Sequence, residues 1–376
     1  MKAAVHTIPF PAPGLRVETR PSRGIDAMLA AEIDALAHRA AEPNPFHEAW
    51  MLDAALRHLA GPPMTLLLMR DADDALVGLW PLRRCSRFRG LPLPTLESWQ
   101  HDYLFLGSPL LAADCLAPAL EALLDWLAGA HGPRILQVRA MRADGPVAIA
   151  LDRAIAARRR VAAYVAHYER ALLRVGASAD VSGKHRKELR RLERRLAERG
   201  DVGYRALRAG DDAEPWIERF LAVEAGGWKG SDGTALASRD GDRAFFVQAC
   251  REAHRHGRLR LFEMTLDGIP IAVKCNFAAG DGAFMFKIGY DERYAKYSPG
   301  LLLELFAMDA APATGDGTVW VDSCARGGHF MAERLWPERR RLADYTISAR
   351  GAVARALVRN GDLIHRIRRR FGAHGG

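Results

Sequence analysis

Two kinds of hydrophobic pattern alternate along the chain: segments with the spacing of a helix, and shorter apolar runs typical of strands. Apolar residues recur every three or four positions in six segments, which predicts helices at 24–40, 44–61, 115–129, 215–225, 243–257 and 300–311. Shorter apolar runs bounded by turn residues predict strands at 64–84 (a hairpin), 101–111, 133–141, 258–277 (a hairpin), 282–292 and 317–324. Asp267-Gly268 is a strong turn signal inside the second hairpin.

The two halves of the chain share one order of elements: helices, hairpin, strand, loop, helix, strand. Such duplication changes the fold prediction. We expect an α/β (α+β) protein with mixed sheets, built as two tandem units at 1–170 and 171–348 and followed by a basic tail at 349–376. The segment 153–173 is interpreted as a linker whose later part can be a strand.

Composition narrows the class of protein. The chain has 376 residues and is 49% hydrophobic, enough for two cores. We find neither an apolar run of membrane-spanning length nor the apolar core of a signal peptide. The five cysteines lack paired spacing, which argues against disulfides and a zinc site and fits the cytoplasm. No HExxH run is present, so no metal is expected.

The net charge of +9 is concentrated in two segments. Residues 184–199 carry +5 and residues 349–376 carry +6, so the rest is close to neutral. The first segment predicts a basic helix, Lys184–Arg199, that docks an acyl carrier protein or tRNA. The tail predicts a cationic amphipathic helix, 352–371, that contacts an anionic membrane surface. The alternative is a solvated helix face and a frayed tail.

The stretch Tyr-Ser-Pro-Gly at 297–300 begins the apolar helix at 300–311. Ser298 suits the N-cap and Pro299 suits the first turn. Gly300 costs about 1 kcal/mol against alanine inside a helix, but it lets a ligand approach the backbone. Together with the first-turn N–H groups it predicts an anion cradle for a phosphate. Close packing against the sheet is the alternative.

Four stretches of the second half resemble the GNAT superfamily of acyltransferases. They are EAGGWKGSDGTAL (224–236), TLDGIPIAVKCNF (265–277), YDERYAKYSPGLLL (290–303) and DSCARGGHFMAERLWPERR (322–340). The resemblance is closest to the CelD-like branch, which is distantly similar to the Fem aminoacyl transferases with two GNAT units in tandem. The first half matches only in pattern: its nearest counterpart of the helix start is Gly107-Ser108-Pro109, so we expect a degenerate unit there.

The resemblance implies a donor site at the helix start. The family's Gln/Arg-x-x-Gly-x-Gly/Ala loop corresponds here to Tyr297–Leu302, with one glycine instead of two. The donor is therefore left open between acyl-CoA, an acyl carrier protein and aminoacyl-tRNA, none of them a permanently bound cofactor. Ser298, Pro299, Gly300 and Leu301 would bind it. By the same resemblance, a bulge at Gly289 would free a backbone N–H for the acyl oxygen; a plain strand-end glycine is the alternative.

Acyl transfer to an amine needs a base, oxyanion donors and a group that protonates the leaving group. Candidate catalytic residues are Glu224, Asp322, His329 and Tyr297, with Tyr290 and Tyr294 beside the last. Trp228 and Lys229, on a glycine-flanked loop, are candidate substrate-binding residues. Each has a structural alternative: helix closure at Gly226 with Trp228 as an apolar plug, a loop cap for Asp322, and an ordinary histidine at 329. Cys324 is interpreted as a buried thiol.

The sequence predicts an N-acyltransferase that acts on a small-molecule or polymer amine. The alternative is a GNAT-like binding module that has lost its chemistry and docks an acidic partner or nucleic acid through the basic helix. The single glycine of the loop and the lack of an unmistakable base favour the alternative.

Overall fold

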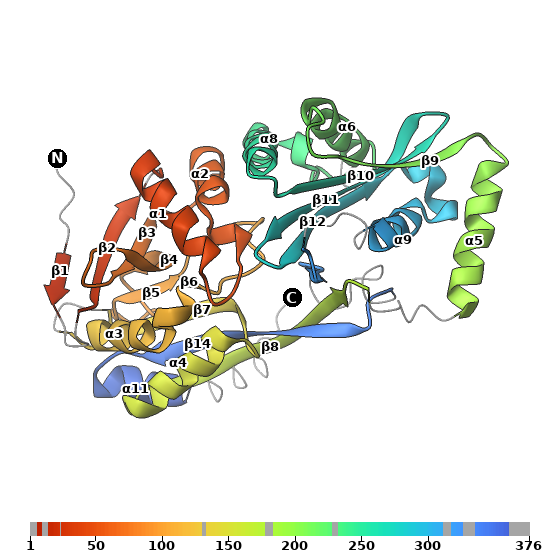
Figure 1. Cartoon of the computed structure of the whole chain (residues 1–376). Helices are drawn as coiled ribbons and strands as arrows, with labels where there is room; N and C mark the ends of the chain where they lie inside the picture. The colour runs from red at the N-terminus through yellow and green to blue at the C-terminus, as the bar shows by residue number, and fades with distance from the viewer. Residues whose placement is uncertain are drawn as a thin grey trace. The chain divides into compact units, whose positions relative to one another are not determined.

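The computed structural model describes residues 6–9, 14–22, 24–129, 133–176, 183–227, 232–310, 317–325 and 335–360 (Figure 1). The chain forms two compact units. Unit 1 comprises residues 1–49, 61–168 and 341–376, and unit 2 comprises residues 50–60 and 169–340. The chain leaves unit 1 within strand β8 (Val161–Arg174) and returns within strand β14 (Glu338–Ser348).

Unit 1 is a mixed sheet with the strand order β1-β2-β3-β4-β5-β7-β14. Its other strands are β1 (His6–Pro9), β2 (Arg16–Ser22), β3 (Met64–Arg70), β4 (Leu76–Cys85), β5 (Thr95–Ser98), β6 (Leu110–Leu111) and β7 (Ile135–Arg142). Its α-helices are α1 (Ala27–His38), α3 (Leu116–Ala128), α4 (Pro146–Ala157) and α11 (Ala352–Arg359). Only β5 and β7 pair in parallel among the described strands of this unit, and α3 lies between them in sequence. β3 is buried along its whole length, so side chains cover both faces of this sheet.

Unit 2 has the strand order β8-β13-β12-β11-β10-β9. Its strands are β9 (Val202–Ala206), β10 (Leu259–Leu266), β11 (Ile269–Ala279), β12 (Gly282–Tyr290) and β13 (Trp320–Asp322), beside the end of β8. Its helices are α2 (Ala49–His58), α5 (Gly183–Ala197), α6 (Glu214–Ala225), α8 (Asp240–Arg255), α9 (Pro299–Ala310) and the 3-10 turn η4 (Glu292–Tyr297). Within the described part of unit 2, only β12 and β13 pair in parallel, and η4 and α9 lie between them in sequence.

The two units repeat one topology. In each, four antiparallel strands (β2–β5 and β9–β12) lead through a helical connection to a fifth strand that pairs in parallel with the fourth, and a sixth strand pairs antiparallel with the fifth. The sixth strand comes from elsewhere in the chain: β14 serves unit 1, and the end of β8 serves unit 2. The predicted α/β class with mixed sheets in two repeated units is confirmed.

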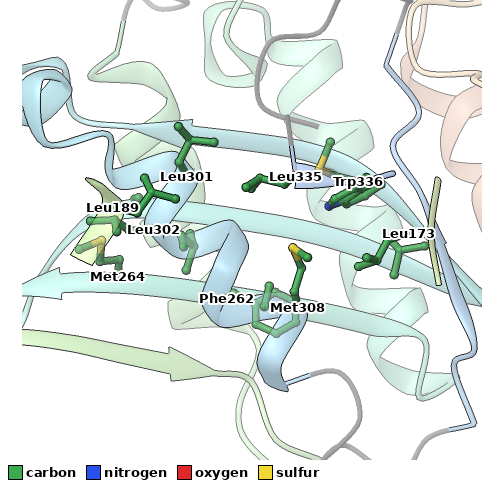
Figure 2. Packing of buried hydrophobic residues seen from close by; sticks show 14 of the residues in the cluster. Leu173, Leu189, Phe262, Met264, Leu301, Leu302, Met308, Leu335 and Trp336 are labelled. Carbon is green, nitrogen blue, oxygen red and sulfur yellow. The ribbon is translucent and has the colours of Figure 1, made fainter. Parts of the chain in front are cut away.

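Helices cover both faces of the unit 2 sheet. Figure 1 shows α6 and α8 on one side of β10–β12 and α9 on the other. The period of two in β11 explains this, because Val273, Cys275 and Phe277 are buried toward α8 and α2 while Ala272 packs in the α9 core. In that core, Leu189 of α5 lies beside Leu302 of α9 (Figure 2).

The division of the chain differs from the expected bounds at two places. Helix α2 lies in unit 2 because Trp50 packs on Phe277 with ring centroids 5.3 Å apart, and because His58 Nε2 and Gln248 Oε1 are 2.7 Å apart. Residues after 340 lie in unit 1 because β14 pairs with β7, from Leu342 opposite Arg142 to Ser348 opposite Ile135.

Several local predictions are confirmed and others are wrong. Asp267 and Gly268 both have positive φ, 50° and 77°, as the tight hairpin turn requires. The strand predicted at 101–111 is wrong, since only Leu110–Leu111 is extended and paired. The described part of the tail is helical only at Ala352–Arg359, and 361–376 lie outside the described residues. Within the described residues, no helix is both long and apolar enough to cross a membrane.

Candidate functional site

Strand β12 contains a bulge shortly before the candidate site residue Gly289. Cys275 pairs with Lys287, whereas the next residue of β11, Asn276, pairs with Met285, so Phe286 is the extra residue. The bulge puts two consecutive side chains on one face. Phe286 stacks on Phe246 of α8, and Lys287 reaches Glu224 of α6. The bulge predicted at Gly289 therefore lies three residues earlier.

Two of the candidate site residues, Glu224 and Gly289, lie in contact. A Cβ at Gly289 would lie 3.2 Å from the Glu224 Cα, so glycine allows α6 to approach the strand closely. The Glu224 carboxylate is 1% exposed. It accepts hydrogen bonds from Lys287 Nζ (2.7 Å) and from the Leu236 N–H (2.9 Å). These bonds tie α6 to β12 and compete with any role of Glu224 as a base.

A cavity of about 510 Å³ lies at the end of this strand. It is lined by Arg219, Ala222, Val223, Gly226, Ile269, Pro270 and Asp291–Arg293. Gly226 ends α6 there, as the alternative interpretation of that segment predicted. Arg293 holds the pKa of Asp291 below its ordinary value through a side-chain hydrogen bond. The cavity thus lies between α6 and the β10–β11 turn, and the ionised carboxylate of Asp291 forms part of its wall.

Helix α9 begins at Pro299, as predicted, but its N-cap works differently. Ser298 has a left-handed backbone (φ 54°, ψ 49°) and ends η4. Its carbonyl oxygen accepts from the N–H groups of Leu301 (3.0 Å) and Leu302 (3.1 Å). Pro299 has no N–H, so Gly300 supplies the one first-turn N–H for which the described residues show no acceptor. Pro299, Gly300 and Leu301 are buried.

Tyr297 packs beneath the start of α9. Its side chain is 5% exposed and lies in the same core as Leu301 and Leu302. Lys296 Nζ lies 5.1 Å from the Tyr297 ring centroid. Leu189 and Leu196 of α5 belong to the same core, at 1% and 0% exposure. The basic helix therefore rests with its apolar side on η4 and α9.

The exposed side of α5 is cationic. Lys187, Arg190, Arg191, Arg194 and Arg195 are exposed, as is Arg199 just beyond the helix. Arg191 pairs with Glu188 at 2.6 Å. No carboxylate of the described residues forms a salt bridge with the others.

Asp322 ends β13 between two buried arginines. Its carboxylate contacts Arg170 Nε at 2.5 Å and Arg340 Nη1 at 2.7 Å, and it accepts the Cys324 N–H at 2.9 Å. Burial alone would raise the pKa of Asp322, but the charges of Arg170 and Arg340 hold it below its ordinary value. Arg340 also lies 4.1 Å from the Trp320 ring centroid. A fully buried carboxylate that stays ionised is a weak base, so this geometry fits anchoring of the β13 end.

A second buried ion pair was not predicted. Lys274 of β11 and Glu304 of α9 are 2.7 Å apart and only 2% and 3% exposed. Lys274 Nζ also lies 5.7 Å from the Trp336 ring and 5.9 Å from the Phe262 ring. Each is a lone charge in an apolar element, AVKCNF and LLLELF, and that shared pattern is the signal that could have found the pair.

Three predicted site residues, Trp228, Lys229 and His329, lie outside the described residues. Cys324 is 7% exposed, and burial raises the pKa of its thiol, so it is a poor nucleophile, as interpreted from the sequence. The described residues contain no cluster of His, Cys, Asp and Glu that could hold a metal ion.

These features define the class of the site: an α/β unit with a bulged strand, a parallel crossover and a helix start of Ser-Pro-Gly. Residues 183–324 match the family model described as the acetyltransferase (GNAT) domain. No curated protein matches the sequence significantly.

Solved structures share the fold across both units. FemX is 12% identical, with a TM-score of 0.57, over 84% of this chain and 95% of that chain. The C-terminal domain of a putative lysylphosphatidylglycerol synthetase from Agrobacterium fabrum is 12% identical, with a TM-score of 0.53, over 89% and 95%. L-PGS from Bacillus licheniformis is 12% identical, with a TM-score of 0.54, over 89% and 96%. Residues 183–324 of unit 2 are thus similar to a GNAT domain, and the solved structures share the fold of the chain.

Proposed function

We propose that this protein is an N-acyltransferase whose reaction takes place in unit 2. The observation that carries the proposal is the crossover from the bulged strand β12 through Ser298-Pro299-Gly300 to α9 and parallel β13, inside the segment that matches a GNAT domain. The Gly300 N–H and the dipole of α9 would bind a donor phosphate. Positioning of two substrates would supply much of the rate.

The amine acceptor would enter the cavity beside Gly226, whose wall includes the carboxylates of Asp291 and Glu292. In the reaction, the amine nitrogen forms a bond to the acyl carbon and loses a proton. The bond from that carbon to the donor sulfur or oxygen breaks, and the leaving atom takes up a proton. Tyr297, the candidate proton donor to the leaving group, lies at the start of α9 but is packed into the core. The leaving atom would have to approach the start of α9 closely to take a proton from it.

The donor would be carried by a polyanion, either an acyl carrier protein or aminoacyl-tRNA, rather than used as free acyl-CoA. The exposed cations of α5 support this choice, because that helix packs directly on η4 and α9. A fold shared with a putative lysylphosphatidylglycerol synthetase domain is compatible with an aminoacyl group as cargo. Membership of the CelD-like branch and a cytoplasmic location remain predictions, the latter supported by five free cysteines.

Donor binding can be tested by the melting temperature of the purified protein with acetyl-CoA, a long-chain acyl-CoA, an acyl carrier protein and aminoacyl-tRNA. A donor at 100 times its Kd stabilises the folded protein by about 2.7 kcal/mol. Gly300→Glu should abolish the shift, and Gly300→Ala should reduce it without loss of stability. Ala295→Glu, an exposed change in η4, is the matched control.

Arg190→Gln/Arg194→Gln tests the carrier separately. It should weaken only the polyanionic donors, whereas Arg208→Gln/Arg239→Gln, an equal loss of charge elsewhere in unit 2, should not. No shift with any donor would contradict the proposal.

The binding-module alternative has one observation in its favour. Both predicted carboxylate bases, Glu224 and Asp322, have their oxygens engaged by cations and backbone N–H groups. Binding of tRNA or carrier that depends on Arg190 and Arg194, with no acylated amine detected by mass spectrometry over a panel of amines, would favour this alternative.

A further inference from the structure

Unit 1 contains a cavity that the proposed acyl transfer does not use. Its volume is about 520 Å³, and it lies where β4 ends, β5 and β7 begin, and α11 starts. Three arginines line it: Arg84, Arg134 and Arg350. The other lining residues are Cys85, Pro92–Leu96, Pro133 and Gly351–Ala354. No aspartate or glutamate is among the described residues of its wall.

Backbone hydrogen bonds hold the wall of this cavity together. The Arg134 N–H donates to the Pro94 carbonyl at 2.6 Å, and the Arg134 carbonyl accepts from the Ala349 N–H at 2.8 Å. Ala354 of α11 packs on Phe88 and Ile135, which fixes the helix to the end of the sheet. The cavity is therefore a part of the folded unit rather than a gap beside a loose tail.

Gly351 brings the arginines close to the start of α11. It has φ 89°, a conformation that favours glycine, and a Cβ there would lie 3.1 Å from Arg134 Nη1. The guanidinium of Arg134 thus passes against the backbone of Gly351. A side chain at 351 would strain the backbone and displace this cation.

Arg84 forms no salt bridge with a carboxylate of the described residues. Its guanidinium donates to Thr19 Oγ1 at 2.6 Å, which is a neutral partner. Burial lowers the pKa of Arg84, and no carboxylate of the described residues offsets that effect. The nearby acid on β5, Glu97, pairs instead with Arg83 at 2.7 Å and with the Cys85 thiol at 2.5 Å. Arg134 also forms no salt bridge with a described carboxylate.

We propose that this cavity is a second binding site, for a phosphate group attached to an apolar body. Arg84 and Arg134, which form no salt bridge with a described carboxylate, suit a phosphate group, because arginine binds phosphate oxygens through two parallel N–H bonds. The apolar part of the ligand would lie on Pro92, Leu93, Pro133 and Val353. Val353 is 60% exposed, which fits a contact that a ligand completes. The phosphate could belong to a soluble compound or to a lipid headgroup.

Titration calorimetry of the full chain with pyrophosphate and with inorganic phosphate tests the site. Saturable binding should weaken at least about tenfold in Arg84→Gln and in Arg134→Gln, because each change removes charge-assisted hydrogen bonds. Arg153→Gln, an exposed arginine of α4, is the matched control and should bind as the wild type does. Val353→Glu gives a second variant: it adds an acid to the first turn of α11, where acids are favourable, and should compete with the ligand.

Co-sedimentation with vesicles distinguishes the two sources of phosphate. Binding to phosphatidylglycerol vesicles, but not to phosphatidylcholine vesicles, that is lost in Arg134→Gln and Val353→Glu would support the site with a lipid as its source. Saturable pyrophosphate binding alone would support it with a soluble ligand. Neither kind of binding, or binding that Arg153→Gln weakens as much as Arg134→Gln does, would overturn the proposal.

Discussion

The helical connections of the two parallel strand pairs are built in different ways. In unit 1, residues 99–115 separate β5 from α3. Side chains from other elements hydrogen-bond to carbonyl groups of this connection. Asn44 Nδ2 donates to the carbonyls of Leu106 (3.1 Å) and Ser108 (2.7 Å), and Trp80 Nε1 donates to that of Gly107 (3.1 Å). In unit 2, the short 3-10 helix η4 and its caps, residues 291–298, connect β12 to α9, and Gly300 follows at the helix start. The proposed donor site therefore lies in the unit whose connection is short.

The units also differ in the polar groups they bury. Unit 2 buries full charges in pairs, such as Asp322 with Arg170 and Arg340. Unit 1 also buries the carboxylates of Glu42 and Glu48, and it holds two neutral histidines as well: burial lowers the pKa of buried His47 and of half-buried His101 to about 3. Ion pairs and neutral imidazoles respond differently to mutation and to pH, which makes this comparison testable.

Asp322→Ala should cause the largest loss of stability. It leaves Arg170 and Arg340 as uncompensated buried charges, which costs about 3–5 kcal/mol. Urea unfolding should therefore show a clear drop in the free energy of unfolding, with Asp309→Ala, an exposed acid on α9, close to wild type. A loss under about 1 kcal/mol would show that the two arginines find other partners and that the anchoring interpretation is wrong.

Acidification should destabilise unit 1 before unit 2. Histidine in the unfolded chain takes up a proton near its ordinary pKa of 6.5, whereas folded His47 and His101 do so only near a pKa of about 3. The folded state is thus favoured above pH 6.5, and it loses stability as the pH falls from 6.5 toward 3. From pH 6.5 to 5 the loss is about 2 kcal/mol per histidine. The lowered pKa of Asp322 makes its contribution disappear only at still lower pH, below the ordinary aspartate pKa of 3.8.

Hydrogen exchange at pH 7.5 and 5, resolved for β3 and β10, measures this difference. The protection factor, which corrects for the slower intrinsic exchange at pH 5, should fall more in β3 than in β10 on acidification. His101→Gln should reduce that fall, while exposed His256→Gln should not. An equal fall of the protection factors in both strands would contradict the assignment of acid sensitivity to the two histidines.

Alanine at Gly107 and at Gly300 should have opposite effects on stability. A Cβ at Gly107 would lie 2.1 Å from the Arg139 carbonyl oxygen, so the backbone of unit 1 must shift at a cost of about 1–3 kcal/mol. Gly300→Ala lies in a helix and should be neutral or stabilise by up to about 1 kcal/mol. Thermal unfolding measures both. A loss at Gly300 as large as that at Gly107 would mean that Gly300 serves close packing.

Strong periodicity was enough to predict most of the helices, both hairpins and the repeated order. Helix α4 and strand β14 were not predicted. α4 falls partly in the expected linker, and β14 contains ERRR and Asp344, whose charges hide a strand with buried Leu342, Tyr345 and Ile347. The role of β14 as the last strand of unit 1, and of the end of β8 as the last strand of unit 2, could not be predicted. Pairing between segments that are distant in sequence leaves no local pattern.

The candidate site was predicted in part. The helix start and the contact partners Glu224 and Gly289 were singled out, but the bulge position and the engagement of Asp322 were not. Both depend on residues from other elements. Phe286 stacks on Phe246 of α8. Asp322 accepts a hydrogen bond from Arg170, which is 152 positions away in the sequence. Short-range pattern indicates which residues are unusual, whereas their partners decide what they do.

The smallest net change is expected when both members of the Lys274–Glu304 pair are replaced. Lys274→Met alone should cost about 3–5 kcal/mol because Glu304 keeps a buried charge without its partner, but Lys274→Met/Glu304→Leu should lie near wild type or above it. A double-mutant cycle of urea unfolding measures the coupling. If the double variant is stable yet loses donor binding, the pair supports the proposed donor site at the start of α9. If it is stable and binds normally, the buried Lys274–Glu304 pair is no requirement of the proposed donor site.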